Sequence, residues 1–229
     1  ELQDMQIEQT VKLLNHTNPY TGLRYADDPF LFCVELFNED SVLFYGTNNK
    51  LHISPTIRDR IGRQFAEWLT AKYGTNAAWR AAWGDDVIIE RPAIAGQQSR
   101  GLVEMDLLVG ELEPERLTGV IVPWCSPWFA DKAMIPGTEQ AVLKQRLLDT
   151  MTFLVGLQNK FYDRFTEAVR ETGFDGEIVR SNWQAGSLVG HLLNLYSDAQ
   201  SGMVDRHNYF GGPQQAMQGK AKINHASIL

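Results

Sequence analysis

The sequence predicts an α/β fold in which parallel strands alternate with helices. Three short apolar runs typical of strands, at 30–37, 177–183 and 203–210, are separated by stretches with helical periodicity. The order strand, helices, strand, helix, strand is typical of βαβ units, whose strands run parallel. Each apolar run also ends in polar side chains. Because the active sites of parallel α/β folds lie at the carboxyl ends of the strands, we expect these three ends to converge on one site.

The first third of the chain contains a helix, a loop and the first strand. The segment before Asn18-Pro19 is apolar in part and has no helix breaker, so it is predicted to be helical. Residues 16–29 contain Asn-Pro, Thr-Gly and Asp-Asp-Pro, which are turn signals. The apolar run 30–37 is interrupted only by Glu35. It is too short for a typical globular helix, and we interpret it as a strand covered on both faces.

A helical region follows this strand and leads into an irregular one. Residues 55–83 place apolar side chains at three- and four-residue steps, and Gly74 is expected to divide the helix in two. Residues 84–136 hold short apolar runs among Gly, Pro and acidic residues. We interpret this second stretch as irregular, with small strands at most.

The most regular helical pattern covers 138–172, where apolar residues form one continuous stripe. Thr138 is the predicted N-cap, and Gly173 is the predicted C-terminal stop. After the strand at 177–183, a shorter helix is expected over 186–202, ending at its last glycine.

Composition limits the class of protein. The 229 residues are 44% hydrophobic and 21% charged, which fits a single globular domain. The net charge is -7 and no basic tract is present, so nucleic acid is not an expected partner. No apolar run is long enough to span a bilayer. Cys33 and Cys125 form no metal or redox spacing, and whether they pair stays open. Because the chain begins at Glu1 inside a predicted helix, we expect it to be a piece of a longer protein.

Glu39 is the candidate catalytic residue. It follows an apolar strand and has aromatic neighbours in Phe37 and Phe44, so desolvation is expected to raise its pKa. A carboxyl group with a raised pKa is suited to general acid catalysis. Asn38 beside it is expected to hydrogen-bond a substrate hydroxyl. The alternative is that residues 38–41 only cap the next turn.

Several tryptophans are candidates for sugar binding. Asn182 and Trp183 end the second strand, and the Trp183 ring offers a stacking platform for the apolar face of a sugar. A buried core position is the alternative for this ring. The Pro-rich stretch "VPWCSPWF" contributes Trp124 and Trp128, whose rings suit a binding cleft.

The third strand contributes His207 and Tyr209, which alternate and therefore share one face. Both are expected to position a catalytic carboxylate, and a half-buried strand with a satisfied histidine is the alternative. Cleavage of a glycosidic bond also needs a second carboxylate, about 5–5.5 Å away in retaining enzymes. Glu35 lies about 13 Å from Glu39 at strand rise and is interpreted as a buried structural acid. Asp205 lies below the strand end, so no nucleophile is identified.

Three short segments resemble the same family. "VELFNEDS" resembles the signature of clan A glycoside hydrolases, which are retaining enzymes on a (β/α)8 barrel. "VRSNW" is similar to the fifth-strand end of that clan and "DRHNYF" to its sixth strand. The resemblance implies a partial (β/α)8 TIM barrel with parallel strands and a large helical insertion after the fourth strand. Residues 1–229 would form one incomplete catalytic domain, with 50–136 as the insertion.

The resemblance also implies a mechanism. Glu39 would be the acid/base at the end of the fourth strand, and the nucleophile would be a glutamate of the seventh strand, outside this chain. Asn38 would hold the sugar 2-hydroxyl, while Trp183, Trp124 and Trp128 would line the subsites. The substrate would be a β-linked poly- or oligosaccharide, with no cofactor or metal. Secretion or a periplasmic location would be expected.

Two other functions remain open from the sequence. A metal-dependent enzyme would use Glu39, Asp205 and His207 as ligands, although no His-x-His or His-x-x-x-His spacing is present. A carbohydrate-binding protein without catalysis would keep the same fold and lack the nucleophile. The sequence carries no signal for the oligomeric state.

Overall fold

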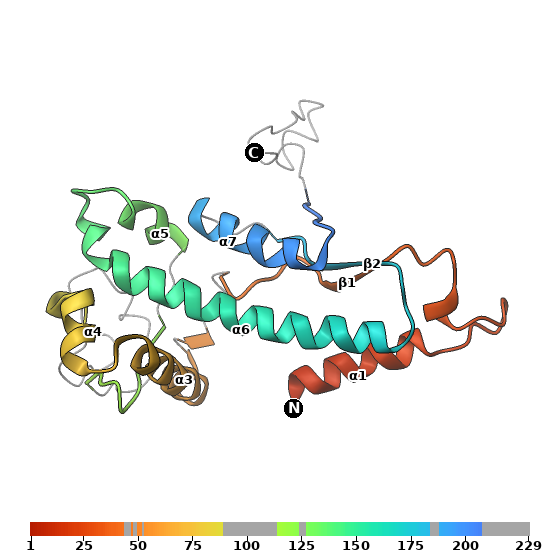
Figure 1. The fold of residues 1–229 in the computed structure, drawn as a ribbon, viewed down its shortest axis with the longest axis horizontal. Coiled ribbons are helices and arrows are strands. Elements are labelled where there is room, and N and C mark those ends of the chain that lie inside the picture. Colours follow the sequence, from red (N-terminus) through yellow and green to blue (C-terminus); the bar gives the residue numbers. More distant parts are fainter. Residues whose placement is uncertain are drawn as a thin grey trace, which may run out of the picture.

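The computed structural model describes residues 1–43, 47, 50, 51, 53–88, 114–123, 127–183 and 188–207. This part of the chain is mostly helical and contains one small sheet (Figure 1). The elements with their bounds are α1 (Leu2–Leu14), η1 (Tyr25–Asp27), β1 (Cys33–Phe37), α3 (Pro55–Tyr73), α4 (Asn76–Trp83), η2 (Asp85–Val87), α5 (Pro127–Ala133), η4 (Glu139–Leu143), α6 (Lys144–Glu171), β2 (Glu177–Ser181), α7 (Leu188–Asp198) and η5 (Ala199–Ser201).

The predicted partial barrel is wrong. Within the described residues the sheet has two strands, β1 and β2, whereas a barrel wall needs each strand paired on both sides. The predicted third strand is not formed at 203–207, where the backbone makes no ladder, and 208–210 lie outside the described residues. The prediction of this strand used the alternation of His207 and Tyr209. Such an alternation indicates an extended backbone, but it does not show that the segment pairs with another strand. The fold is therefore a helical body that carries one βαβ-like strand pair.

The two strands are parallel, as the alternation of strands and helices predicted. Cys33 pairs with Glu177 at one end of the sheet, and Phe37 pairs with Ser181 at the other. A parallel pair needs a long crossover, which the helices from α3 to α6 supply. Because both strands run the same way in register, the residues that follow them emerge at the same edge.

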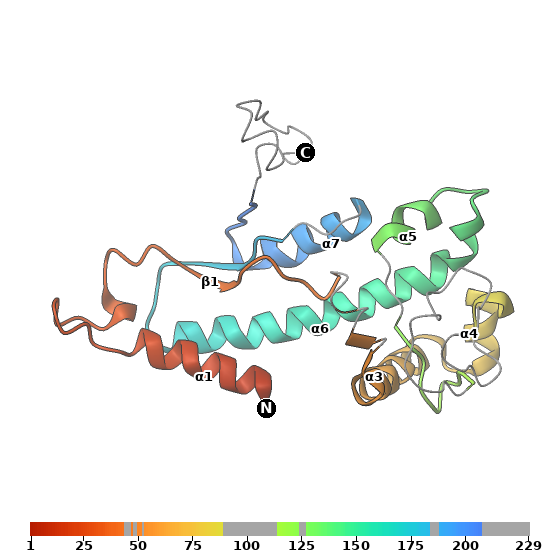
Figure 2. The same ribbon diagram turned by 180° about the vertical axis from the view of Figure 1, so that it is seen from behind.

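Helix α6 is the central element. Both views show the sheet and α7 on one side of α6, and α1 and α3 on the other (Figure 1 and Figure 2). The predicted apolar stripe of this helix is confirmed by a row of buried side chains: Leu147, Met151, Leu154, Phe161, Phe165 and Val169. Even α6, with 28 residues, is not apolar enough to cross a membrane, and neither is any other helix in the described part of the chain.

The core has two parts along α6. The first half of the helix packs on α3 and α4 through a large cluster that includes Phe65, Trp79 and Trp83. The second half packs on α1 and on the sheet, where Leu36 and Ile178 are buried. This second cluster packs the strand pair against α1 and α6, and it thereby positions the edge at which both strands end.

Glycines end several helices, as predicted. Gly74 divides α3 from α4 with a φ of 75°, and Gly173 and Gly202 follow α6 and η5 with φ of 91° and 100°. Glycine adopts this left-handed backbone without steric cost. Thr138 is the N-cap position of η4, which continues directly into α6 at Lys144, but its side chain accepts no capping hydrogen bond. The Thr138 hydroxyl instead donates to carbonyls of the preceding turn.

Candidate active site at the ends of the two strands

Glu39 has an unusual backbone at the end of β1. Among the described residues it is the single non-glycine residue with a positive φ, at 47°. This left-handed conformation costs an L-residue on the order of 1–2 kcal/mol, so the surroundings must hold it in place. One such restraint is its backbone N–H, which donates a 2.6 Å hydrogen bond to Oδ1 of Asn182. The end of β1 is thereby attached to the end of β2.

The Glu39 side chain is attached to a third segment. Its Oε1 lies 2.8 Å from Nδ1 of His207, which belongs to the extended segment after η5. The two side chains are 27% and 35% exposed, so both can be reached by a ligand. The hydrogen bond to Glu39 raises the pKa of His207, and the nearby Asp205 charge adds to this effect. The predicted pairing of His207 with the candidate acid is therefore present.

Asn182 connects the members of this group. The residue is buried at 1% exposure, and its Nδ2 lies 2.7 Å from Nε2 of His207 and 3.5 Å from Oδ1 of Asn38. Its Oδ1 accepts from the Glu39 N–H, which settles the orientation of the amide. The amide nitrogen can only donate to the imidazole, and the Glu39 carboxylate can only accept from it. Neutral His207 therefore carries its proton on Nδ1.

Glu35 belongs to the site, and its interpretation as a buried structural acid is wrong. Its side chain is exposed, and its carboxylate accepts a hydrogen bond from Nδ2 of Asn182. Partial desolvation raises the pKa of Glu35, and the charge of His207 opposes this rise. The strand-rise estimate measured the spacing of backbone positions. It did not account for the reach of a glutamate side chain toward the strand end.

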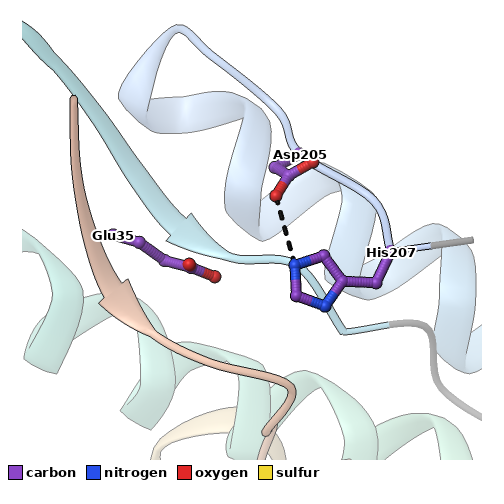
Figure 3. Close-up of side chains that lie close together, drawn as sticks. All are labelled: Glu35, Asp205 and His207. Carbon is purple, nitrogen blue, oxygen red and sulfur yellow. Dashed lines mark ion pairs between the residues drawn. The ribbon is translucent and has the colours of Figure 1, made fainter. Parts of the chain in front are cut away.

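Asp205 also lies at the site, although its position below the strand end had argued against it. Its Oδ2 is 3.5 Å from Nε2 of His207. In Figure 3 the carboxylate of Glu35 points from β1 toward His207, and Asp205 lies beside the same imidazole. The ligand-capable atoms of Glu35, Asp205 and His207 all lie within 4.8 Å of one another. The metal-dependent alternative had grouped Asp205 and His207 with Glu39, whereas the structure places Glu35 in this group and Glu39 at the other ring nitrogen of His207.

The aromatic candidates are only partly placed. Trp183 is half-buried and lies two residues after the end of β2, and its backbone N–H donates a 3.1 Å hydrogen bond to the Ser181 hydroxyl. It is thus outside the fully buried core. Trp124, Tyr209 and the side chain of Trp128 lie outside the described residues, so their roles stay predictions.

A buried ion pair holds the His207 segment against the body. Arg206 Nη1 lies 2.9 Å from Oδ2 of Asp198, which is the last residue of α7 and completely buried. Burial raises the pKa of Asp198 to about 6, although Arg206 acts in the opposite direction. Sequence reasoning missed this pair, because nothing in the pattern of α7 marks its last residue as buried.

One cavity in the described part of the chain is separate from this cluster. A space of about 330 Å³ lies between α1, α6 and the turn after β1, and its lining includes Asp40, Ser41 and Gln158. None of the clustered groups of Glu35, Glu39 and His207 lines it. We therefore define the site by the convergent polar groups and not by the cavity.

Compared with known proteins, the chain matches no family model, no curated protein sequence and no solved structure. The resemblance to clan A glycoside hydrolases consequently depends on the short motifs at the strand ends. Function has to be argued from the geometry of the site itself.

Proposed function

We propose that this chain supplies the general acid/base, Glu39, of a retaining glycosidase that acts on a β-linked poly- or oligosaccharide. The observation that carries the proposal is the restraint on Glu39. Its left-handed backbone is held by Asn182, and its carboxylate is held by His207. Strained residues that the surroundings hold in place concentrate at functional sites, which supports a catalytic role over a simple turn.

The first step of the reaction uses Glu39 as an acid. Protonated Glu39 gives its proton to the glycosidic oxygen while the bond from that oxygen to the anomeric carbon breaks. A second carboxylate, supplied from outside residues 1–229, forms a bond to the anomeric carbon at the same time. Asn38, which lies 3.5 Å from Asn182, is in position to hydrogen-bond a sugar hydroxyl.

The second step uses Glu39 as a base. The carboxylate removes a proton from water, and the water oxygen attacks the anomeric carbon and displaces the enzyme carboxylate. His207 donates through Nδ1 to Glu39 and stabilises its ionised form in this step. Glu39 is 27% exposed and Trp183 is half-buried, which supports access of a ligand to both side chains.

The proposal can be tested by comparing substrates with different leaving groups, using the complete polypeptide that contains this chain. Wild type and Glu39→Gln are assayed on β-linked oligosaccharides and on aryl β-glycosides whose phenols differ in acidity. We expect Glu39→Gln to lose about 10²–10⁴-fold on oligosaccharides and less on glycosides of acidic phenols, which need no protonation.

The matched control for this assay is Glu177→Gln, an exposed glutamate at the opposite end of the same sheet. It is expected to retain wild-type rates. Full activity in Glu39→Gln would contradict the proposal. Binding of oligosaccharides without hydrolysis by wild type would instead favour a carbohydrate-binding function.

A further inference from the structure

We propose that Glu35, Asp205 and His207 form a binding site for one divalent metal ion, with Zn²⁺ as the fitting cation. The inference goes beyond glycoside cleavage and does not depend on it. The three side chains come from β1 and from the segment after η5, which are separated by most of the chain. Their ligand atoms nevertheless lie within 4.8 Å of one another (Figure 3).

The spacing is compatible with coordination. Metal–ligand bonds of about 2.0–2.2 Å place neighbouring ligand atoms about 3.0–3.5 Å apart in tetrahedral or octahedral sites. Glu35 is exposed and the Asp205 side chain is 42% exposed, so both can rotate toward that spacing once the Asn182 amide nitrogen between Glu35 and His207 is displaced. The same exposure gives an ion a route from solvent.

The orientation of His207 favours a metal at Nε2. Its Nδ1–H donates to Glu39 at 2.8 Å, so the lone pair of the neutral ring is on Nε2. Nε2 is also the nitrogen that lies 3.5 Å from Asp205. Metal-binding histidines commonly donate their second N–H to a carboxylate, which fixes the ring and its tautomer. Glu39 occupies that outer position here.

Charge and donor type select the class of cation. The carboxylates of Glu35, Glu39 and Asp205 lie around one imidazole, so the cluster offers three anionic groups against one basic one. A divalent cation offsets this charge. The imidazole nitrogen suits Zn²⁺ and related ions, whereas Mg²⁺ and Ca²⁺ prefer sites made of oxygen alone.

Asn182 competes with the metal in this arrangement. Its Nδ2 donates to Glu35 and lies 2.7 Å from Nε2 of His207, so the amide occupies the space between two of the ligands. Its hydrogens supply the positive partial charge that a cation would supply. Metal binding must displace this amide nitrogen, and replacing it with an oxygen ligand should strengthen binding.

The test is a titration of the metal-free protein with Co²⁺, followed by visible absorption, and with Zn²⁺, followed by calorimetry. Wild type is expected to bind one ion saturably. Glu35→Gln and His207→Gln are expected to weaken binding at least tenfold. Asn182→Asp, which adds a carboxylate oxygen in place of the amide nitrogen, is expected to tighten it at least tenfold.

Controls separate this site from adventitious binding. His16→Gln and Glu177→Gln alter residues outside the cluster and should bind as wild type does. Because His207→Gln also removes the bond to Glu39, Glu35→Gln provides the test in which that bond is kept. Wild-type affinity in Glu35→Gln, or absence of saturable binding in both wild type and Asn182→Asp, would overturn the proposal. Neither result depends on glycosidase activity.

Discussion

The backbone N–H of Glu39 donates a 2.6 Å hydrogen bond to the side-chain oxygen of Asn182, which attaches the end of β1 to the end of β2. The same amide then reaches His207 through its nitrogen, at 2.7 Å. One buried side chain therefore restrains both the backbone of the candidate acid and the ring that contacts its carboxylate. Consequences of this arrangement can be measured without a substrate.

The left-handed backbone of Glu39 predicts an inverted order of stability between two variants. Glu39→Gly should be more stable than Glu39→Ala by about 1 kcal/mol, because both lose the carboxylate but only glycine is free of the left-handed penalty. Urea denaturation of both variants measures the difference. At Glu177, in a regular strand, the alanine variant should be the more stable of the pair. If the alanine variant is more stable than the glycine variant at Glu39, as it is at Glu177, the backbone of Glu39 is not strained.

The hydrogen-bond network predicts the tautomer of His207. At a pH that leaves the ring neutral, its proton should be on Nδ1, because Glu39 accepts there and Asn182 donates to Nε2. The ¹⁵N chemical shifts of the two ring nitrogens, recorded with a chelator present, distinguish the tautomers. His16, which is outside this network, serves as the internal reference. A ring protonated on Nε2 would rule out the network.

The buried carboxyl of Asp198 predicts a specific pH dependence. Its pKa in the folded protein is about 6, above the ordinary value of 3.8, so between these values the folded state holds more protons than the unfolded chain. Stability from this group therefore falls as the pH rises from about 4 to 6. Asp198→Asn removes this titration. Wild type should lose up to about 3 kcal/mol relative to the variant across that window.

Urea denaturation of wild type and Asp198→Asn at several pH values measures this difference. The comparison cancels the titration of all other groups, which the two proteins share. Below about pH 4 Asp198 is protonated and neutral in both the folded and the unfolded state, so wild type and Asp198→Asn are expected to differ least there and to separate as the pH rises toward 6. Parallel pH profiles would contradict the assignment of the raised pKa to Asp198.

The convergence of the strand ends could be predicted from the sequence. Asn38, Glu39 and Asn182 follow apolar runs that form neighbouring parallel strands, so their meeting at one edge follows from the direction of the strands. His207 was also correctly placed beside Glu39. Its neighbour Arg206, which anchors the segment on buried Asp198, left no recognisable pattern in the sequence.

The barrel was wrong for a physical reason that the segment 203–207 illustrates. The backbone there forms no strand ladder, and the side chains of Arg206 and His207 hold the segment through Asp198 and Glu39 instead. Glu35 was placed too far from the site because the distance estimate used the spacing of backbone positions and left out the length of the glutamate side chain. Motifs of a few residues at three strand ends describe a local arrangement of side chains, and they do not determine how many strands surround it.

Azide rescue can test whether Glu39 is the acid/base. The measurement uses Glu39→Ala in the complete polypeptide, with an aryl β-glycoside of an acidic phenol as substrate, and Glu177→Ala as control. Azide needs no base, so it attacks the anomeric carbon of the accumulated glycosyl-enzyme and displaces the enzyme carboxylate. We expect a rate that rises with azide in Glu39→Ala alone, together with a β-glycosyl azide as product. An unchanged rate without glycosyl azide, from a variant that remains folded, would contradict this role of Glu39.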